Sequence, residues 1–167
     1  MDTNDSKPVQ VGYFLFHRLP GGYLGAMLVT DSKGLPLEFK CTEAIKPTDL
    51  QRHLYGETME PHIAIHLCIL PLLNKITNKP KLLFVNEESF LTAREEKDFP
   101  VLFIQATESV VEEGQTAIVL KSHSKYESDK TLFEEEVKTA CLFAFTEPFG
   151  RVEQAVKVLG EKDEKFR

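Results

Sequence analysis

The sequence contains no tryptophan and only three cysteines, and it lacks a long apolar run. The cysteines, Cys41, Cys68 and Cys141, lie far apart without a CxxC pair, so the pattern is neither a zinc ribbon nor a disulfide framework. The longest apolar stretch, residues 63–73, is shorter than the roughly 20 residues that cross a bilayer. We therefore expect a soluble protein of the cytoplasm, where thiols stay reduced, without a membrane as partner.

An excess of positive charge is also absent. The sequence has 20 basic and 26 acidic residues, a net charge of −6, and the two signs are interspersed. A protein that binds nucleic acid normally presents a basic stripe that displaces counterions from phosphate. The lysines within residues 75–81 and 121–130 are too few to form such a stripe. On the basis of charge, we do not expect nucleic acid as a partner.

The length and composition that remain are those of one folded domain. A chain of 167 residues with 42% hydrophobic residues can bury a core without a disulfide or a structural metal. The first residues are polar and acidic, and the last residues are highly charged. We expect a flexible tail over residues 1–8, a single domain over residues 9–160 and a solvated tail over residues 161–167.

The first part of the chain has the pattern of an antiparallel β-meander. Residues 9–19 and 23–30 are apolar on both faces, as in central strands, and residues 37–42 alternate between apolar and polar. The turn residues Pro20, Gly21 and Gly22 separate the first two strands, and Gly34 suits the turn that precedes the third strand.

Helical signals begin after the meander. Thr48 and Gln51 have the spacing of a capping box, and the helix they start should pause at Gly56. Residues 63–76 are apolar nearly all round and should be buried, with a bend at Pro71. The remaining elements expected are strands at 82–85, 101–104 and 117–120 and helices at 87–97, 130–143 and 148–159.

This order predicts an α/β fold: a single domain with a mixed sheet, in which the N-terminal meander is followed by helical crossovers to parallel strands. Over residues 9–105 the order resembles the ribonuclease-H-like architecture. Enzymes of that family carry acids on the first strand, the first helix and the end of the fourth strand, which hold two divalent metals. Here the first strand has no acid, and the fourth ends at Asn86, with Glu87 and Glu88 in the next element. The resemblance therefore implies the fold with an incomplete catalytic set.

One pair of histidines has the spacing of a metal site. His62 and His66 are four residues apart, so on a helix both imidazoles point to one side, and Glu57, Glu60 or His53 could supply a further ligand. The glutamate of the HExxH signature is missing, because Ile63 follows His62 directly. The alternative is a pair of ordinary histidines, at least one of them buried with a single hydrogen bond. We expect no cofactor; the alternative that these residues suggest is a divalent metal.

Other polar groups have simpler explanations. Asp31, Glu38 and Glu43 flank the meander and could bind magnesium, although an acid on the polar face of a strand is usually solvated. The segment Ser122-His123-Ser124, with Asp129, lacks the rigid turn that a catalytic serine requires. We therefore expect no catalytic residue.

Two functional hypotheses follow. The first is a non-catalytic binding or assembly module that acts with a protein partner, because the core is intact and no complete catalytic set is present. The alternative is a metal-dependent phosphodiesterase or nuclease on a ribonuclease-H-like scaffold, built from His62, His66, Glu57, Glu60 and Asp31. A third hypothesis, a small-molecule sensor, would use the ends of the parallel strands. Neither the oligomeric state nor the identity of a partner follows from the sequence.

Overall fold

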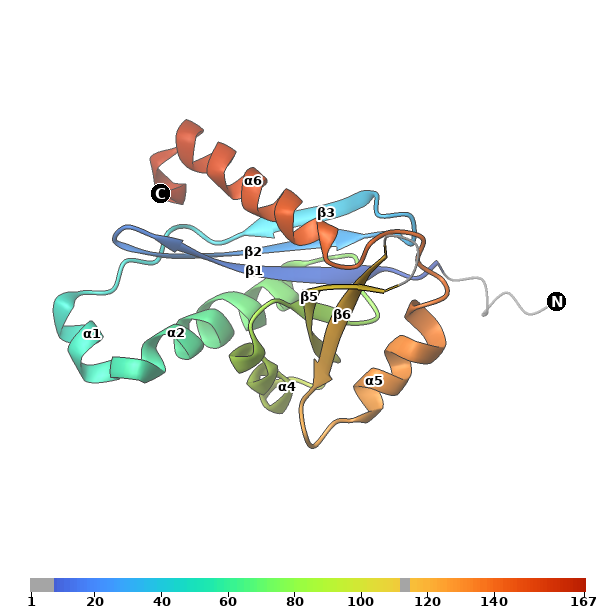
Figure 1. The fold of residues 1–167 in the computed structure, drawn as a ribbon. Coiled ribbons are helices and arrows are strands. Elements are labelled where there is room, and N and C mark those ends of the chain that lie inside the picture. Colours follow the sequence, from blue (N-terminus) through green and yellow to red (C-terminus); the bar gives the residue numbers. More distant parts are fainter. Residues whose placement is uncertain (1–7, 112–114) are drawn as a thin grey trace.

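A six-stranded mixed sheet forms the centre of the molecule, with the strand order β3-β2-β1-β4-β5-β6. The structure is a computed structural model, and it describes residues 8–111 and 115–167. Figure 1 shows that helices lie on both sides of this sheet. The α/β fold with an antiparallel meander and parallel strands is therefore confirmed.

The meander consists of β1 (Val11–Leu19), β2 (Gly22–Thr30) and β3 (Pro36–Cys41), each antiparallel to the next. β1 and β2 pair along their whole length, and every residue of β2 is buried. Gly25 of β2 is needed for close packing, because a Cβ atom there would collide with Cys68. A turn at Pro20 and Gly21 joins β1 and β2 into a hairpin, as the sequence predicts.

The parallel part of the sheet begins with β4 (Leu83–Val85), which lies between β1 and β5 (Val101–Val111) and is parallel to both. The last strand, β6 (Gln115–Ser122), pairs antiparallel with β5. All three strands expected after the meander are present, and β5 and β6 extend beyond their expected ranges.

A long bent helical segment follows the meander. Its consecutive parts are α1 (Asp49–Tyr55), η2 (Gly56–Thr58), α2 (Met59–His62), η3 (Ile63–Ile69) and α3 (Leu70–Lys75). Thr48 and Gln51 form the expected capping box, and Gly56 takes a positive φ of 55°. The difference from expectation is η3, which has π-helical hydrogen bonding. Pro71 explains it, because proline has no N–H to donate and its ring crowds the preceding turn.

The other helices differ from expectation by a few residues at their ends. They are η4 (Glu88–Thr92), α4 (Ala93–Glu96), α5 (Ser128–Leu132), η5 (Phe133–Val137), α6 (Glu147–Lys162) and η6 (Glu164–Phe166). Of these, α6 is longer than predicted, and the helical segments before it are shorter or displaced. In the described part of the chain, no helix has the length and apolar character needed to span a membrane.

The two faces of the sheet bury alternate residues of the central strands. On β1, Phe14 and Phe16 pack with the residues of η3, α3 and η4, whereas Tyr13 packs on the other face with η5. On that other face Leu15 packs with Val152 and Val156 of α6. Because both faces are covered, the central strands are apolar throughout, as observed in the sequence.

Both ends of the chain were expected to be tails. Residues 1–7 lie outside the described residues. The segment 161–167 continues α6 and then forms η6, and Phe166 packs against the core cluster beneath α6. The backbone N–H of Ala44 donates to the carbonyl of Lys165 at 2.7 Å. The C-terminal segment therefore contacts the domain, although most of its residues are exposed to solvent.

Candidate functional site

A crevice opens where the parallel strands β1 and β4 end. In sheets of this kind, the carboxyl ends of parallel strands are the usual place for a ligand. The crevice has a volume of about 500 Å³ and is lined by residues of β1, β2, α1, η2, α2 and η4 and by Glu87 between β4 and η4: Arg18, Tyr23, Arg52, Gly56, Glu57, Met59, Glu60, Pro61, Glu87, Ser89 and Phe90.

The centre of this crevice is a cluster of one guanidinium and two carboxylates. Arg18 comes from the end of β1, Glu60 from α2, and Glu87 follows β4. The Arg18 Nη2 atom lies 2.7 Å from Glu60 Oε1 and 2.9 Å from Glu87 Oε1. Arg18 Nη1 donates to Glu87 Oε2 at 2.9 Å, and Arg18 Nε donates to Glu60 Oε2 at 3.3 Å. All four carboxylate oxygens thus accept hydrogen bonds from one side chain.

These contacts favour the charged forms of Arg18 and Glu60. Hydrogen bonds to Glu87 and Glu60 raise the pKa of Arg18 above its ordinary value, and the bond from Arg18 lowers the pKa of Glu60. The side chains remain partly exposed, at 47% for Arg18, 38% for Glu60 and 30% for Glu87. One positive charge faces two negative charges, so the cluster retains an excess of negative charge.

Aromatic and basic neighbours fix the walls of the crevice. Phe16 precedes Arg18 by two residues on the same face of β1, and its ring stacks on Tyr23 with centroids 5.0 Å apart. The Arg18 guanidinium lies 5.2 Å from the centroid of the Phe16 ring. Arg52 Nη2 donates to the carbonyl of Gly21 at 3.0 Å, which holds a second guanidinium in the wall.

The structure separates the four metal ligands suggested by the sequence. Glu57 and Glu60 line the strand-end crevice, where Glu60 binds Arg18. His62 and His66 lie side by side, with ring centroids 5.1 Å apart, as their spacing predicts. They line a different cavity of about 190 Å³, together with Glu95 and Glu96 among other residues. Within residues 8–111 and 115–167, no three His, Cys, Asp or Glu side chains are grouped closely enough to hold a metal ion.

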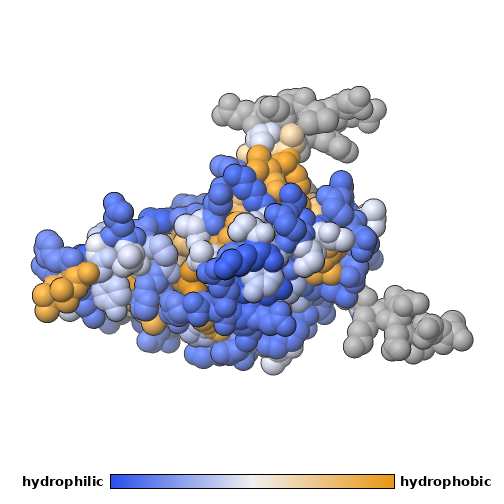
Figure 2. Space-filling view, turned by 90° about the horizontal axis from the view of Figure 1, so that it is seen from below, coloured by the Kyte–Doolittle hydropathy of each residue, from blue (hydrophilic) through white to orange (hydrophobic). Residues whose placement is uncertain are grey.

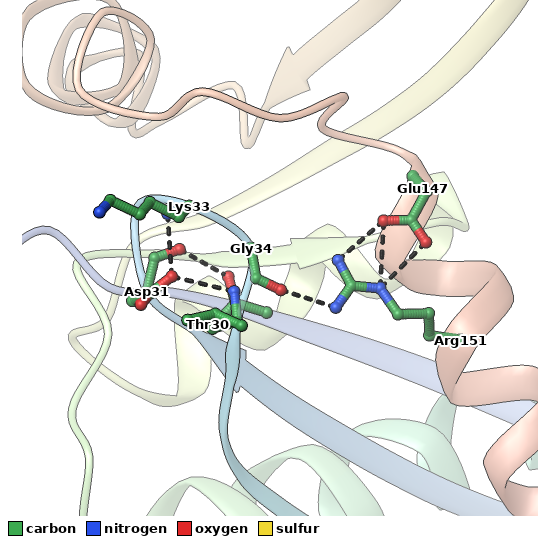
Figure 3. Close-up of polar contacts among 7 residues, drawn as sticks. Thr30, Asp31, Lys33, Gly34, Glu147 and Arg151 are labelled. Carbon is green, nitrogen blue, oxygen red and sulfur yellow. Dashed lines mark hydrogen bonds and ion pairs between the residues drawn. The ribbon is translucent and has the colours of Figure 1, made fainter.

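Two of the three acids beside the meander, Asp31 and Glu38, have structural partners, whereas Glu43 is exposed. Asp31 Oδ1 accepts hydrogen bonds from the backbone N–H groups of Lys33 and Leu35, both at 2.9 Å, and so closes the turn after β2. Figure 3 shows this turn, with Arg151 of α6 pairing with Glu147 and donating to the carbonyl of Gly34.

Glu38 has a comparable role on β3. Its carboxylate accepts hydrogen bonds from the backbone N–H groups of Asn78 at 2.8 Å and Thr77 at 2.9 Å. These bonds, first that from Asn78, lower the pKa of Glu38 to about 2. Glu38 therefore anchors the loop after α3.

The segment after β6 contains a buried ion pair. Arg94 Nε donates to Asp129 Oδ2 at 2.9 Å, and the Arg94 guanidinium also lies 3.9 Å from the centroid of the Tyr126 ring. His123 Nε2 lies 3.2 Å from Glu95 Oε1. Asp129 thus pairs with Arg94, and this arrangement positions α5 against α4.

Glu60 was among the site residues predicted from the sequence, whereas Arg18 and Glu87 were not. Because the first strand carries no acid, the catalytic set appeared incomplete. The structure provides Glu60 with a strand partner of opposite charge. The sequence did contain one signal for this contact. Arg18 and Glu87 are charged residues at the ends of the first and fourth strands, where a ligand site is common in sheets with parallel strands.

Comparisons with known proteins concern the fold. No family model and no curated protein matches the sequence. Among solved structures, endonuclease V of Ciona intestinalis in complex with a DNA containing inosine has a TM-score of 0.42 and 14% identity, over 78% of this chain and 57% of that chain. Endonuclease V of Bacillus subtilis has a TM-score of 0.43 and 11% identity, over 71% and 62%. This chain thus spans less than two thirds of either endonuclease.

A protein of unknown function from Archaeoglobus fulgidus is similar over a larger share of its length. Its TM-score is 0.44 and its identity is 11%, over 81% of this chain and 88% of that chain. At these values the likeness is one of fold alone.

Proposed function

We propose that this protein is a metal-dependent phosphodiester hydrolase of the nuclease class, with its site in the strand-end crevice. The observation that carries the proposal is the convergence of Glu60 and Glu87, from two different elements, at the ends of β1 and β4. The volume of about 500 Å³ lies within the range of small-molecule sites. This is the alternative hypothesis drawn from the sequence, with Glu87 in place of the histidines.

The crevice offers two carboxylates to a divalent cation, and water or a substrate phosphate would supply the remaining ligands. Carboxylate oxygens are the ligands that Mg²⁺ and Mn²⁺ prefer, and Glu60 and Glu87 already gather four of them around one positive group. Ion pairs between partly exposed side chains contribute only about 0–1 kcal/mol each, so Arg18 can be displaced. With no acid on β1, the site has ligands for one metal rather than for two.

A cation held there would act as a Lewis acid and lower the pKa of a bound water molecule. The side chains of the crevice would bind the cation and the substrate phosphate. Glu60 and Glu87 would hold the cation, while the guanidinium groups of Arg18 and Arg52 would bind phosphate oxygens, for which their planar donors are suited. Tyr23 and Phe90 form apolar parts of the wall that limit access of water.

The test is hydrolysis of a labelled single-stranded oligonucleotide and of bis(p-nitrophenyl) phosphate, with EDTA-treated protein and added Mn²⁺ or Mg²⁺. We expect metal-dependent cleavage that Glu60→Gln or Glu87→Gln reduces at least about a hundredfold, as for the loss of a major catalytic contribution. Glu57→Gln is the matched control, because Glu57 lines the same crevice but is not bonded to Arg18. The proposal would be overturned if neither substrate were cleaved, or if Glu60→Gln retained full activity.

A second candidate, the non-catalytic module with a protein partner, is favoured by the helix α1. No residue of α1 is buried, and Leu50 and Leu54 are 68% and 75% exposed. Figure 2 shows apolar side chains gathered at the end of the molecule that α1 forms. If the protein neither cleaves phosphodiesters nor binds a metal, a stoichiometric partner lost on Leu54→Ser would support this function.

The histidine pair remains a separate proposal for a metal site. His62 and His66 share a cavity with Glu95 and Glu96, whereas Glu57 and Glu60 line the other crevice. Metal binding that is lost in His66→Ala but kept in Glu87→Gln would assign the metal to the histidines. The opposite result would assign it to the strand-end crevice.

A further inference from the structure

We infer that Arg18 is a built-in cation that competes with a divalent metal ion for Glu60 and Glu87, and so sets the metal affinity of the crevice. The inference rests on the proposed function, because it concerns the same two carboxylates. It adds a regulatory role for a residue that sequence analysis did not consider.

The first support is that Arg18 bonds to every oxygen atom of the two carboxylates. Arg18 donates to both oxygens of Glu60 and to both oxygens of Glu87, at distances between 2.7 and 3.3 Å. Among the described residues, it is the one basic side chain that forms an ion pair with either carboxylate. A metal ion bound by these oxygens would have to replace these hydrogen bonds.

The second support is that Arg18 can leave without unfolding the site. Its side chain is 47% exposed, and it lies one residue before the last residue of β1, next to a turn. The guanidinium already lies 5.2 Å from the centroid of the buried Phe16 ring, and this contact does not involve the carboxylates. Arg18 released from the carboxylates would be available to an anionic substrate.

Arg52 supplies a matched control. It is an arginine of the same crevice, but it donates to the carbonyl of Gly21 instead of to a carboxylate. Arg18→Gln and Arg52→Gln therefore remove the same charge from the same cavity. Only Arg18→Gln removes hydrogen bonds from Glu60 and Glu87. A general electrostatic effect would change both variants alike, whereas direct competition would distinguish them.

The experiment is calorimetric titration of EDTA-treated protein with Mn²⁺ alone. We expect Arg18→Gln to lower the Mn²⁺ Kd about tenfold, equivalent to about 1.4 kcal/mol. Arg52→Gln should lower it by less than about threefold, and Arg18→Lys should give an intermediate value because an ammonium cannot bind both carboxylates in fork geometry. Adding Glu60→Gln to Arg18→Gln should abolish the gain. Circular dichroism verifies that each variant is folded.

Equal effects of Arg18→Gln and Arg52→Gln, or no tightening in Arg18→Gln, would overturn the inference. Its failure can be distinguished from that of the proposed function. Tighter Mn²⁺ binding by Arg18→Gln in a protein that cleaves no phosphodiester would support the competition and refute the hydrolase. Cleavage by the unmodified protein without tightening in Arg18→Gln would do the reverse.

Discussion

Glu38 illustrates how much a single side chain on an edge strand can contribute. Its carboxylate bonds to the backbone N–H groups of Thr77 and Asn78, 39 and 40 residues further along the chain. The sequence analysis considered Glu38 as a magnesium ligand or a solvated acid, because alternation along the strand shows which face it occupies but not what lies opposite. The partner loop is brought there by the helices between β3 and β4.

This contact predicts a pH dependence of stability. The folded-state pKa of Glu38 is about 2, below its ordinary value of 4.5, so the ionised form is favoured by folding. The contribution is therefore present above about pH 4.5 and is lost as the pH falls towards 2. In Glu38→Gln this part of the acid dependence should disappear, as measured by urea denaturation between pH 2 and 6.

The matched control for this measurement is Glu43→Gln, which removes an exposed carboxylate from the segment that follows β3. It should retain the acid dependence of the unmodified protein. If Glu38→Gln also retained that dependence, the bonds to Thr77 and Asn78 would not be the cause.

At the scale of elements, features that depend on residues close together in the sequence were predicted, whereas contacts between distant residues were not. The capping box of Thr48 and Gln51 is set by residues three apart, and the structure contains it. The π-helical part η3 was not predicted, because the sequence places Pro71 in the helix without showing how the preceding turns adjust. Arg18 lies 42 residues from Glu60 and 69 from Glu87, so their meeting depends on the parallel pairing of β1 and β4.

The helix α1 provides a test of local stability. Because α1 has no buried residue, its first turn depends on the cap rather than on packing. Thr48→Ala should remove about 1 kcal/mol of local stability. Amide hydrogen exchange of residues 50–52 should then become about fivefold faster. Thr58→Ala is the control, since the Thr58 hydroxyl donates to the carbonyl of Tyr55 at the other end of α1. Unchanged exchange in Thr48→Ala would show that tertiary contacts hold α1.

At the scale of the whole molecule, the packing explains where a ligand can bind. Helices cover both faces of the sheet, so the central strands offer side chains to a ligand mainly at their ends. β4 ends beside Phe14 of β1, Glu87 follows it and reaches Arg18 near the end of β1, and the connection through α2 brings Glu60 to the same place. From the alternation of elements, the ends of the parallel strands could be predicted as a place for a ligand. The identity of the groups there required the three-dimensional packing.

This arrangement leads to a prediction for the stability of the whole domain. A ligand that binds only the folded state at about a hundred times its Kd adds roughly 2.7 kcal/mol of stability. For a domain of this size, that should raise the Tm by about 5–10 °C. We expect Mn²⁺ to give such a shift in thermal unfolding of EDTA-treated protein, and Arg18→Gln to reach it at a lower Mn²⁺ concentration.

Three variants assign the shift to one part of the molecule. Loss of the shift in Glu87→Gln, with retention in His66→Ala and Glu57→Gln, would locate the metal between Glu60 and Glu87. Loss in His66→Ala alone would locate it in the cavity of the histidine pair, where it could not assist a reaction at the ends of the strands. If no metal shifts the Tm of either the unmodified protein or Arg18→Gln, the two carboxylates serve only to bind Arg18. The crevice would then be a rigid link between β1, α2 and β4, and the exposed leucines of α1 would become the next surface to test.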